Sequence, residues 1–176
     1  MATVTLRPNG AGTYTDFTAV GDTDPYLCVD ETSSDEDTTY ITTTTSGHKA
    51  TFTIQANSIG ASDTINSVSL TVVRKSATVS RTSTATCYAK VIENSTESND
   101  VGSTTTATYQ YQTRNMTTRP SGGSWTKADI DSLEIGVGVV IGGTPGFRVT
   151  QIYVTVDYTP SGGGGSQTNA IDFAGD

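Results

Sequence analysis

Residues 147–158 read Phe147-Arg-Val-Thr-Gln-Ile-Tyr-Val-Thr-Val-Asp-Tyr158, and this stretch decides the fold class of the chain. Successive side chains of a β-strand point to opposite faces of its sheet. In the second half of the stretch one face is apolar and carries Ile152, Val154, Val156 and Tyr158. The other face is mainly polar and carries Gln151, Tyr153, Thr155 and Asp157. The stretch is therefore predicted to be a strand with one buried face and one face in water.

The apolar positions of this strand change phase between Val149 and Ile152. Residues on one face of a regular strand are an even number of positions apart, whereas these two are separated by an odd number. One extra residue in the strand accounts for the change. The sequence therefore predicts a β-bulge near Thr150.

The same alternation recurs along the chain. In residues 65–74, Val68, Leu70 and Val72 share a face, and residues 133–141 carry the most apolar face of all. Further strand-like segments are residues 2–20, 39–44, 49–55, 84–93 and 104–113. About nine or ten strands at intervals of 8–12 residues, without helical crossovers, predict an all-β antiparallel sandwich or jelly roll. One short helix is predicted near 126–133, because Thr126 and Asp129 have the spacing of a helix cap.

Threonine and serine dominate the composition. Thr occurs 35 times and Ser 18 times, whereas Leu, Ile, Val and Phe together supply 33 of 176 residues. So few large apolar residues are typical of disordered chains. Threonine is β-branched, however, and suits the solvent-facing side of a sheet. The regular alternation therefore favours a folded sheet protein with a polar surface.

The charge pattern argues against two classes of partner. The formal net charge is −8, and the ten Lys and Arg residues form no basic stripe, so we expect no nucleic-acid partner. No run of 18 apolar residues occurs, and the amino terminus lacks the pattern of a signal peptide. We therefore expect no membrane partner, and synthesis in a host cytoplasm without a signal peptide.

Four segments are expected along the chain. Residues 1–20 are predicted to be an amino-terminal strand or arm, and residues 21–159 the β-sandwich. Residues 160–166 are rich in Gly and Ser and are predicted to be a flexible linker. Residues 167–176 form a tail in which Ile171 and Phe173 need an apolar partner. The tail is interpreted either as a docking peptide for a neighbouring subunit or as an unstructured or artificial extension.

The two cysteines, Cys28 and Cys87, both lie in strand-like runs. A free cysteine in such a run is usually a small buried apolar residue, so free thiols are favoured over a disulfide. A disulfide is the alternative, and its long loop would contribute about 4 kcal/mol in the chain-entropy model.

Catalytic groups are sparse, and the chain is predicted not to be an enzyme. The single histidine, His48, has no Cys or His neighbour at metal-ligand spacing and is expected in an exposed turn. No nucleophile elbow, P-loop or dinucleotide fingerprint occurs. A glycosidase would need two carboxylates across a cleft. The nearest candidates, Asp129, Asp131 and Glu134, are better explained as polar residues of the short helix.

No cofactor is predicted, although one acidic segment could hold Ca²⁺. Asp22 and Asp24 precede the acidic residues 30–37, and calcium takes six to eight oxygen ligands. The spacing does not match an EF-hand, because the central glycine and terminal glutamate are absent. A solvated acidic loop is therefore the favoured interpretation.

Exposed aromatic residues can stack on sugar rings while amides and carboxylates bind the hydroxyls. Trp125, Tyr109 and Tyr111 are the candidate glycan contacts. The alternative for Trp125 is a buried plug at the end of the sandwich beside its helix. The alternative for the two tyrosines is cross-strand pairing at a subunit interface.

Several segments together resemble the jelly-roll decoration and surface proteins of tailed bacteriophages. They are Thr39-Tyr40-Ile41, Ile65-Asn-Ser-Val68, Arg119-Pro-Ser-Gly-Gly-Ser-Trp-Thr126, Leu133-Glu-Ile-Gly136 and Gln151-Ile-Tyr-Val-Thr-Val-Asp-Tyr158. The resemblance spans most of residues 25–159. It implies a non-enzymatic protein of the virion surface, such as a capsid decoration protein, whose partners are other copies of itself and other virion proteins.

The hypothesis from the sequence is thus an oligomeric structural virion protein, held to its neighbours by the amino-terminal arm and the tail. Pairing of an extended arm with a sheet edge is the expected mechanism. The alternative hypothesis is a carbohydrate-binding or adhesion module that recognises host glycans. A small glycoside hydrolase or lyase is a third, less favoured class.

Overall fold

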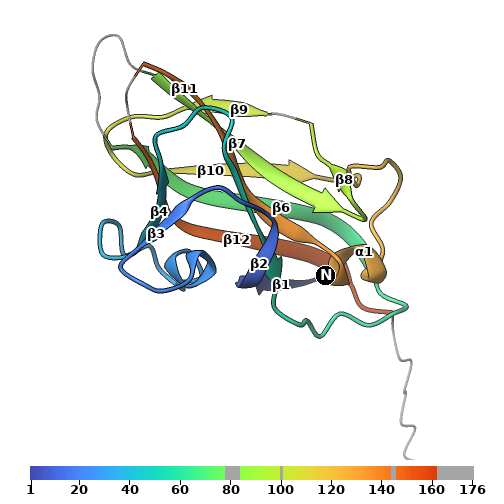
Figure 1. The fold of residues 1–176 in the computed structure, drawn as a ribbon. Coiled ribbons are helices and arrows are strands. Elements are labelled where there is room, and N and C mark those ends of the chain that lie inside the picture. Colours follow the sequence, from blue (N-terminus) through green and yellow to red (C-terminus); the bar gives the residue numbers. More distant parts are fainter. Residues whose placement is uncertain (78–83, 100, 144–145, 162–176) are drawn as a thin grey trace, which may run out of the picture.

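The computed structural model describes residues 1–77, 84–99, 101–143 and 146–161. In this part of the chain, two antiparallel six-stranded sheets face each other as a β-sandwich (Figure 1). A 3₁₀-helix, η1 (Pro25–Cys28), and a short α-helix, α1 (Lys127–Asp131), lie at opposite ends of the sandwich (Figure 1). The prediction of an all-β antiparallel sandwich with one short α-helix is confirmed.

The first sheet is built around the long strands β6 and β12, which pair along almost their whole length. The order of its strands is β10 (Gln110–Met116), β6 (Thr64–Ser76), β12 (Phe147–Thr159), β4 (Tyr40–Thr43) and β3 (Thr18–Val20). Strand β1 (Ala2–Leu6) pairs with the second half of β12. Strand β10 is therefore one edge of this sheet.

The second sheet is built around β11 (Glu134–Gly142), which carries the most apolar sequence. The order is β2 (Pro8–Thr15), β5 (Lys49–Ile54), β11, β7 (Thr84–Glu93) and β8 (Thr96–Glu97). Strand β9 (Gly102–Thr104) also pairs with β7, at residues 86–88, whereas β8 pairs with its last two residues. Strands β8 and β9 thus form the edge of the second sheet.

The space between the sheets holds one hydrophobic core. Val68, Leu70 and Val72 of the first sheet face it, and Ile135, Val137 and Val139 of the second sheet do the same. All six are buried. The outward positions carry mainly Thr, Ser and charged residues, which is the alternation on which the sequence prediction rested.

Strand β12 contains the predicted bulge. Its register against β6 shifts between Val149, which faces Arg74, and Gln151, which faces Val73. The intervening Thr150 is buried, and its hydroxyl donates to Asp35 Oδ1 at 2.9 Å. Because one residue is inserted, Val149 and Ile152 both face the core, as the phase change in the sequence required.

Residues 1–20 are strands of the sandwich. Strand β1 pairs with β12, β2 pairs with β5, and β3 pairs with β4. Strand and arm were the two alternatives for this segment, and in the structure it forms paired strands. The segment cannot serve as a free docking arm in this form, because its backbone already pairs within its own sheets.

The helix α1 begins as predicted and ends earlier. Thr126 is its N-cap, and the backbone N–H of Thr126 donates to Asp129 Oδ2 at 2.8 Å, while the backbone N–H of Asp129 donates to Thr126 Oγ1. This is the predicted capping box. The helix ends at Asp131 rather than Leu133, because Leu133 N–H bonds three residues back to Ile130 and tightens the last turn.

Both cysteines are free and buried, so the prediction of free thiols is confirmed. Burial is the main cause that raises the pKa of Cys28, and it raises the pKa of Cys87 to about 12. Both are therefore protonated at neutral pH and poor nucleophiles. Among the described residues, no helix has the length and apolar character needed to cross a membrane.

Candidate functional site

A groove of about 620 Å³ lies beside strand β10, on the side where the two sheet edges meet. One wall is β10 from Thr113 to Met116, and the other is the segment after β8, with Ser98, Asn99 and Val101. The loop of residues 117–122 closes one end. Binding sites for small ligands commonly have volumes of about 300–1,000 Å³, so the groove is large enough for one or two sugar rings.

The groove exists because β10 is an edge strand. Within the described part of the chain, β10 pairs with β6 alone, so one side of its backbone faces the groove. Its side chains alternate between the two faces of the sheet. Tyr111, Thr113 and Asn115 are exposed, whereas Gln112 and Met116 point inward and are buried.

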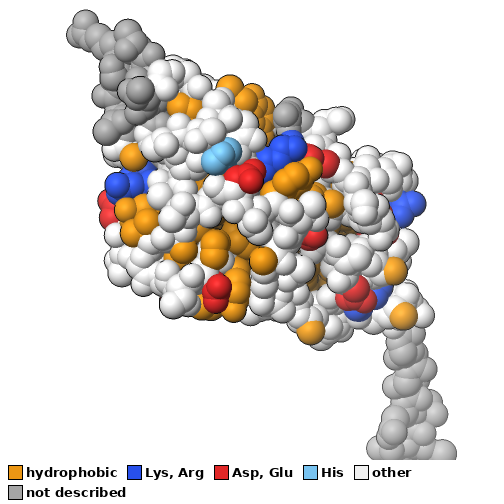
Figure 2. Space-filling view, viewed as in Figure 1, with side chains coloured by type: hydrophobic (Ala, Val, Ile, Leu, Met, Phe, Trp, Pro, Cys, Tyr) orange, Lys and Arg blue, Asp and Glu red, His pale blue; other side chains and the backbone are white. Residues whose placement is uncertain are grey.

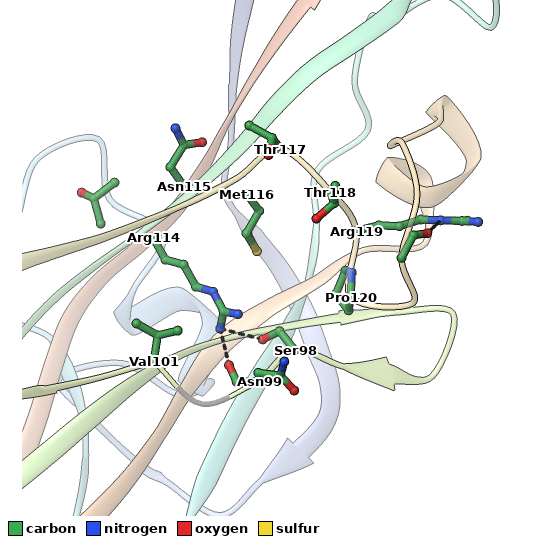
Figure 3. A pocket seen from close by; sticks show the side chains of 12 residues that line it. Ser98, Asn99, Val101, Arg114, Asn115, Met116, Thr117, Thr118, Arg119 and Pro120 are labelled. Carbon is green, nitrogen blue, oxygen red and sulfur yellow. Dashed lines mark hydrogen bonds between the residues drawn. The ribbon is translucent and has the colours of Figure 1, made fainter.

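Arg114 holds the two walls of the groove together. Its Nη1 donates to the carbonyl oxygen of Ala89 on β7 at 3.0 Å, to Ser98 Oγ at 2.9 Å and to the carbonyl oxygen of Asn99 at 2.6 Å. In Figure 3 Arg114 extends from β10 toward Ser98 and Asn99, whereas Asn115 points away from them. Hydrogen bonds from a guanidinium are strong and directional, so Arg114 fixes the width of the groove.

A buried polar layer continues from Arg114 along the space between the sheet edges. Arg74 is buried, and its guanidinium donates to Gln112 Oε1 at 3.1 Å and to Ser103 Oγ at 3.0 Å. The amide of Gln112 donates to the carbonyl oxygen of Val101 at 3.2 Å. Buried polar groups are costly without a hydrogen-bond partner. The hydrogen bonds of Arg74 and Gln112 to Ser103 and Val101 therefore hold β9 and β10 in a fixed relative position.

The loop that closes the groove is anchored to α1. Arg119 donates to Asp129 Oδ1 at 3.1 Å and lies 3.5 Å from Glu93 Oε1. Both carboxylates are buried, and Ser121 Oγ also donates to Glu93 at 2.7 Å. Figure 3 shows Arg119 pointing toward the helix. The ion pairs therefore hold the loop in place from behind.

The pKa of Asp129 reflects this anchoring. Burial by itself raises the pKa of the carboxyl, but hydrogen bonds from the side chain and backbone of Thr126 and the charge of Arg119 outweigh it. The pKa of Asp129 is consequently held below its usual value. The carboxyl stays ionised at neutral pH and supports the loop rather than donating a proton.

Trp125 is the first of the predicted glycan contacts, and the structure removes it from that role. Its side chain is 4% exposed, belongs to the core, and donates from Nε1 to the carbonyl oxygen of Met116 at 3.2 Å. A ring in this position has no face open to a sugar. Trp125 instead packs at the end of the sandwich next to α1, as the plug alternative expects.

The two tyrosines lie in different surroundings. Tyr109 donates from its hydroxyl to the carbonyl oxygen of Glu36 at 2.9 Å and to Asp37 Oδ1 at 3.0 Å. The ammonium of Lys75 lies 4.4 Å from the centre of its ring, and burial is the main cause that raises the pKa of its hydroxyl. Tyr111 is 65% exposed, two residues from Thr113 in the groove wall. Only Tyr111 of the three offers a ring to a ligand.

The predicted catalytic candidates do not form an acid–base pair. Asp129 is buried in the loop anchor, Asp131 pairs with Lys127, and Glu134 accepts from Thr13 Oγ1 at 2.9 Å and from Thr51 Oγ1 at 2.7 Å. His48 is half-buried and its Nδ1 lies 2.8 Å from Thr43 Oγ1. Each group is engaged in a structural contact of its own, although Asp129 and Asp131 both lie on α1.

The acidic segment folds back on β12 and β4. Thr39 Oγ1 lies within hydrogen-bond distance of both Asp35 and Glu31, at 2.8 and 2.6 Å, and Asp37 pairs with Arg148 at 2.7 Å. In the described residues no group of three or more His, Cys, Asp or Glu is placed to hold a metal ion. The predicted tail contacts, Ile171 and Phe173, lie outside the described residues.

Arg114, Ser98 and Asn99 build the groove and were not among the residues predicted from the sequence. One signal was present, because residues 110–116 place Gln112 and Arg114 at the positions that an ordinary strand fills with apolar residues. Polar side chains on the inward face of a strand indicate a polar site between the sheet edges.

Comparison with known proteins identifies no family. No protein-family model matches the chain, and no curated protein matches it. A solved structure described as a Family 16 Carbohydrate Binding Module-2 is similar, with a TM-score of 0.40 and 13% identity over 81% of this chain and 86% of that chain. A TM-score of this size establishes neither a shared function nor a shared site.

Proposed function

We propose that this chain is a non-catalytic module that binds carbohydrate in the groove beside β10. The observation that carries the proposal is the chemistry of the groove lining. It combines hydroxyl groups of Ser and Thr, amides of Asn and guanidinium groups of Arg, and the residues that line it include no carboxylate, imidazole or thiol. Such a lining offers hydrogen bonds to sugar hydroxyls and contains no side chain that commonly acts as a general acid or base at neutral pH.

Tyr111 supplies the second element of a sugar site. Sugars present an apolar ring face, and the exposed Tyr111, which shares a face of β10 with the groove residues Thr113 and Asn115, provides a surface for it. Residues two apart on a strand lie about 7 Å from each other on the same face. Tyr111 is therefore about 7 Å from Thr113 and about 14 Å from Asn115, distances that one and two linked sugar rings can span.

The test is binding of the chain to a panel of immobilised glycans, followed by calorimetry with each glycan retained. Replacement Tyr111→Ala is expected to weaken binding about two- to tenfold, because loss of one stacking contact costs about 0.5–1.5 kcal/mol. Replacement Asn115→Ala is also expected to weaken binding, because it removes an exposed amide from the face of β10 that carries Tyr111.

The matched control is Val140→Ala. Val140 is an exposed apolar residue of β11 on the other sheet, so its truncation removes exposed apolar surface without touching the groove. Its affinity should equal that of the parent protein. Absence of binding to every glycan, or equal binding by the Tyr111 and Val140 variants, would remove the groove from this role.

A particle-surface role is the second candidate function, and one observation favours it. The free backbone edge of β10 can accept a strand from a neighbouring molecule, and an extended segment gains main-chain hydrogen bonds there. The virion location and the contact through Ile171 and Phe173 come from the resemblance and from the sequence of the tail. The oligomeric state of the protein tests this candidate.

A further inference from the structure

A second, smaller hollow lies between β2, β5 and η1, in another part of the fold from the groove. Its volume is about 130 Å³, equal to that of about four water molecules at roughly 30 Å³ each. Phe17, Tyr26 and Phe52 contribute aromatic rings to its lining, together with Ala11 and Ala50. The hollow is thus apolar and has room for a group of four or five heavy atoms.

The hollow results from an irregularity in β2. The register of β2 against β5 shifts between Ala11, which faces Phe52, and Thr15, which faces Ala50. The extra residues bend β2 away from β5, and the small side chains of Ala11 and Ala50 leave the space unfilled. Phe17 is held in place by an edge-to-face contact with Phe147, with ring centres 6.0 Å apart.

An acidic residue stands at this hollow. Asp24 lines it and is exposed, and its carboxylate forms no ion pair with any Lys or Arg that the structure describes. Figure 2 shows hydrophobic side chains gathered near the middle of this face with acidic side chains beside them. No basic residue lines the hollow, so the site favours a positively charged ligand.

The three rings line the hollow mainly from the core side, since Phe17 is 4% and Phe52 2% exposed and Tyr26 is half-buried. Elsewhere in the molecule a Lys or Arg lies over the ring of Tyr14, Tyr40, Tyr109 or Tyr153. In the part of the chain that the structure describes, no such cation lies over Phe17, Tyr26 or Phe52. An apolar pocket with several aromatic rings and one carboxylate has the chemistry that recognises methylated ammonium groups.

We propose that this hollow binds a small quaternary ammonium group of the choline type. Its methyl groups would fill the apolar space against the three rings, and its positive charge would be attracted by the ring faces and by Asp24. A sugar fits poorly, because the lining offers almost no hydrogen-bond partners. The tail of a second copy also fits poorly, because residues 167–176 carry two aspartates and no basic residue.

The test is titration of the full chain with choline, followed by backbone amide NMR. Saturable shifts are expected at Phe17, Tyr26 and their neighbours. The neutral analogue, in which a tert-butyl group replaces the trimethylammonium group, is expected to bind at least about threefold more weakly, because it has the same shape and no charge.

Two substitutions complete the test. Asp24→Asn should weaken choline binding at least about threefold and leave the neutral analogue unchanged. It should not disturb folding, because the Asp24 side chain forms no cap hydrogen bond with η1. The matched control is Asp22→Asn, which removes one charge from the same loop at a residue outside the hollow and should leave binding unchanged.

The results that would overturn the proposal are distinct. Absence of saturable shifts at the hollow excludes a ligand of this class. Equal affinity for choline and its neutral analogue would make the hollow a site for any small apolar group. Equal weakening by the Asp24 and Asp22 substitutions would show that only the general negative charge of the chain attracts choline.

Discussion

At the scale of single residues, one hydroxyl group serves two carboxylates. Thr39 Oγ1 lies 2.6 Å from Glu31 Oε1 and 2.8 Å from Asp35 Oδ2, but it carries one proton and can donate to one of them at a time. The second oxygen of Glu31, Oε2, is buried and has no hydrogen-bond partner among the described residues. An ionised Glu31 is therefore poorly solvated.

The electrostatic surroundings of Glu31 also disfavour its ionised form. Burial is the largest cause that raises the pKa of Glu31, and the negative charges of Asp35 and Asp30 add to it. The hydrogen bond from Thr39 opposes the rise but does not cancel it. Arg7 lies on the other side, where it donates to the backbone carbonyl of Glu31 rather than to its carboxylate.

We predict that Glu31→Gln stabilises the protein at neutral pH by roughly 1 kcal/mol, because it removes a poorly solvated charge from a half-buried side chain. The pKa of Glu31 is higher in the folded than in the unfolded state, so the folded state takes up the proton first as the pH falls. As the pH falls from 7 toward the ordinary pKa of a glutamate, about 4.5, the parent protein should therefore gain stability from this residue. The variant should lack that gain.

Urea unfolding at several pH values between 7 and 5 measures this difference. The control is Glu36→Gln, which removes one charge from the same loop at an exposed side chain. Its free energy of unfolding should follow the parent at every pH. A Glu31 variant that is less stable than the parent at pH 7 would contradict the prediction and show that the ionised carboxylate is well accommodated.

At the scale of elements, strand β11 shows why two of its glycines are not equivalent. Both Gly136 and Gly138 are buried between β5 and β7. A Cβ atom at Gly136 would lie 2.0 Å from the backbone oxygen of Ala50, which the sheet holds in place. A Cβ atom at Gly138 would lie 3.3 Å from Lys90 Cε, near the end of a flexible side chain.

We therefore predict that Gly136→Ala lowers the free energy of unfolding by about 1–3 kcal/mol or more, because the β5 and β11 backbones must move apart. Gly138→Ala should change it by less than about 1 kcal/mol, because Lys90 can adjust. Denaturant unfolding of the two variants side by side measures the difference. Equal losses of unfolding free energy in the two variants would contradict the prediction. They would mean that the paired backbones of β5 and β11 can move apart at little cost.

At the scale of the whole molecule, the described contacts of the sandwich end before the tail begins. The last contact of the described chain is at Ser161, whose backbone N–H donates to Asp63 Oδ1 at 2.8 Å. Removal of residues 162–176 therefore leaves every described contact of the sandwich in place. The tail can be tested for assembly without disturbing the domain.

We predict that the full-length chain is an oligomer in solution and that the chain truncated after Ser161 is a monomer with an unchanged melting temperature. Size-exclusion chromatography with light scattering measures the masses of both. The matched control is full-length chain with Ile171→Ser and Phe173→Ser, which keeps the length and removes the apolar side chains. Monomers throughout would contradict the docking hypothesis and leave the glycan groove as the main interaction site.

The sequence by itself determined the class of fold and several of its details. The alternation of 147–158 identified β12 as a half-buried strand, and the phase change between Val149 and Ile152 located the bulge. The spacing of Thr126 and Asp129 located the start of α1. These features were readable because each depends on residues close together in the chain, whose relative directions are set by backbone geometry.

Only the tertiary structure decided which residues form the sites. It buried Trp125 against Met116, brought Arg114 to Ser98 and Asn99 across two sheet edges, and enclosed the hollow between β2 and η1. In each case the partners come from segments that approach only when strands pair and the two sheets pack. The exposure of a side chain between two such segments depends on how the segments pack, so it cannot be predicted from the local sequence alone.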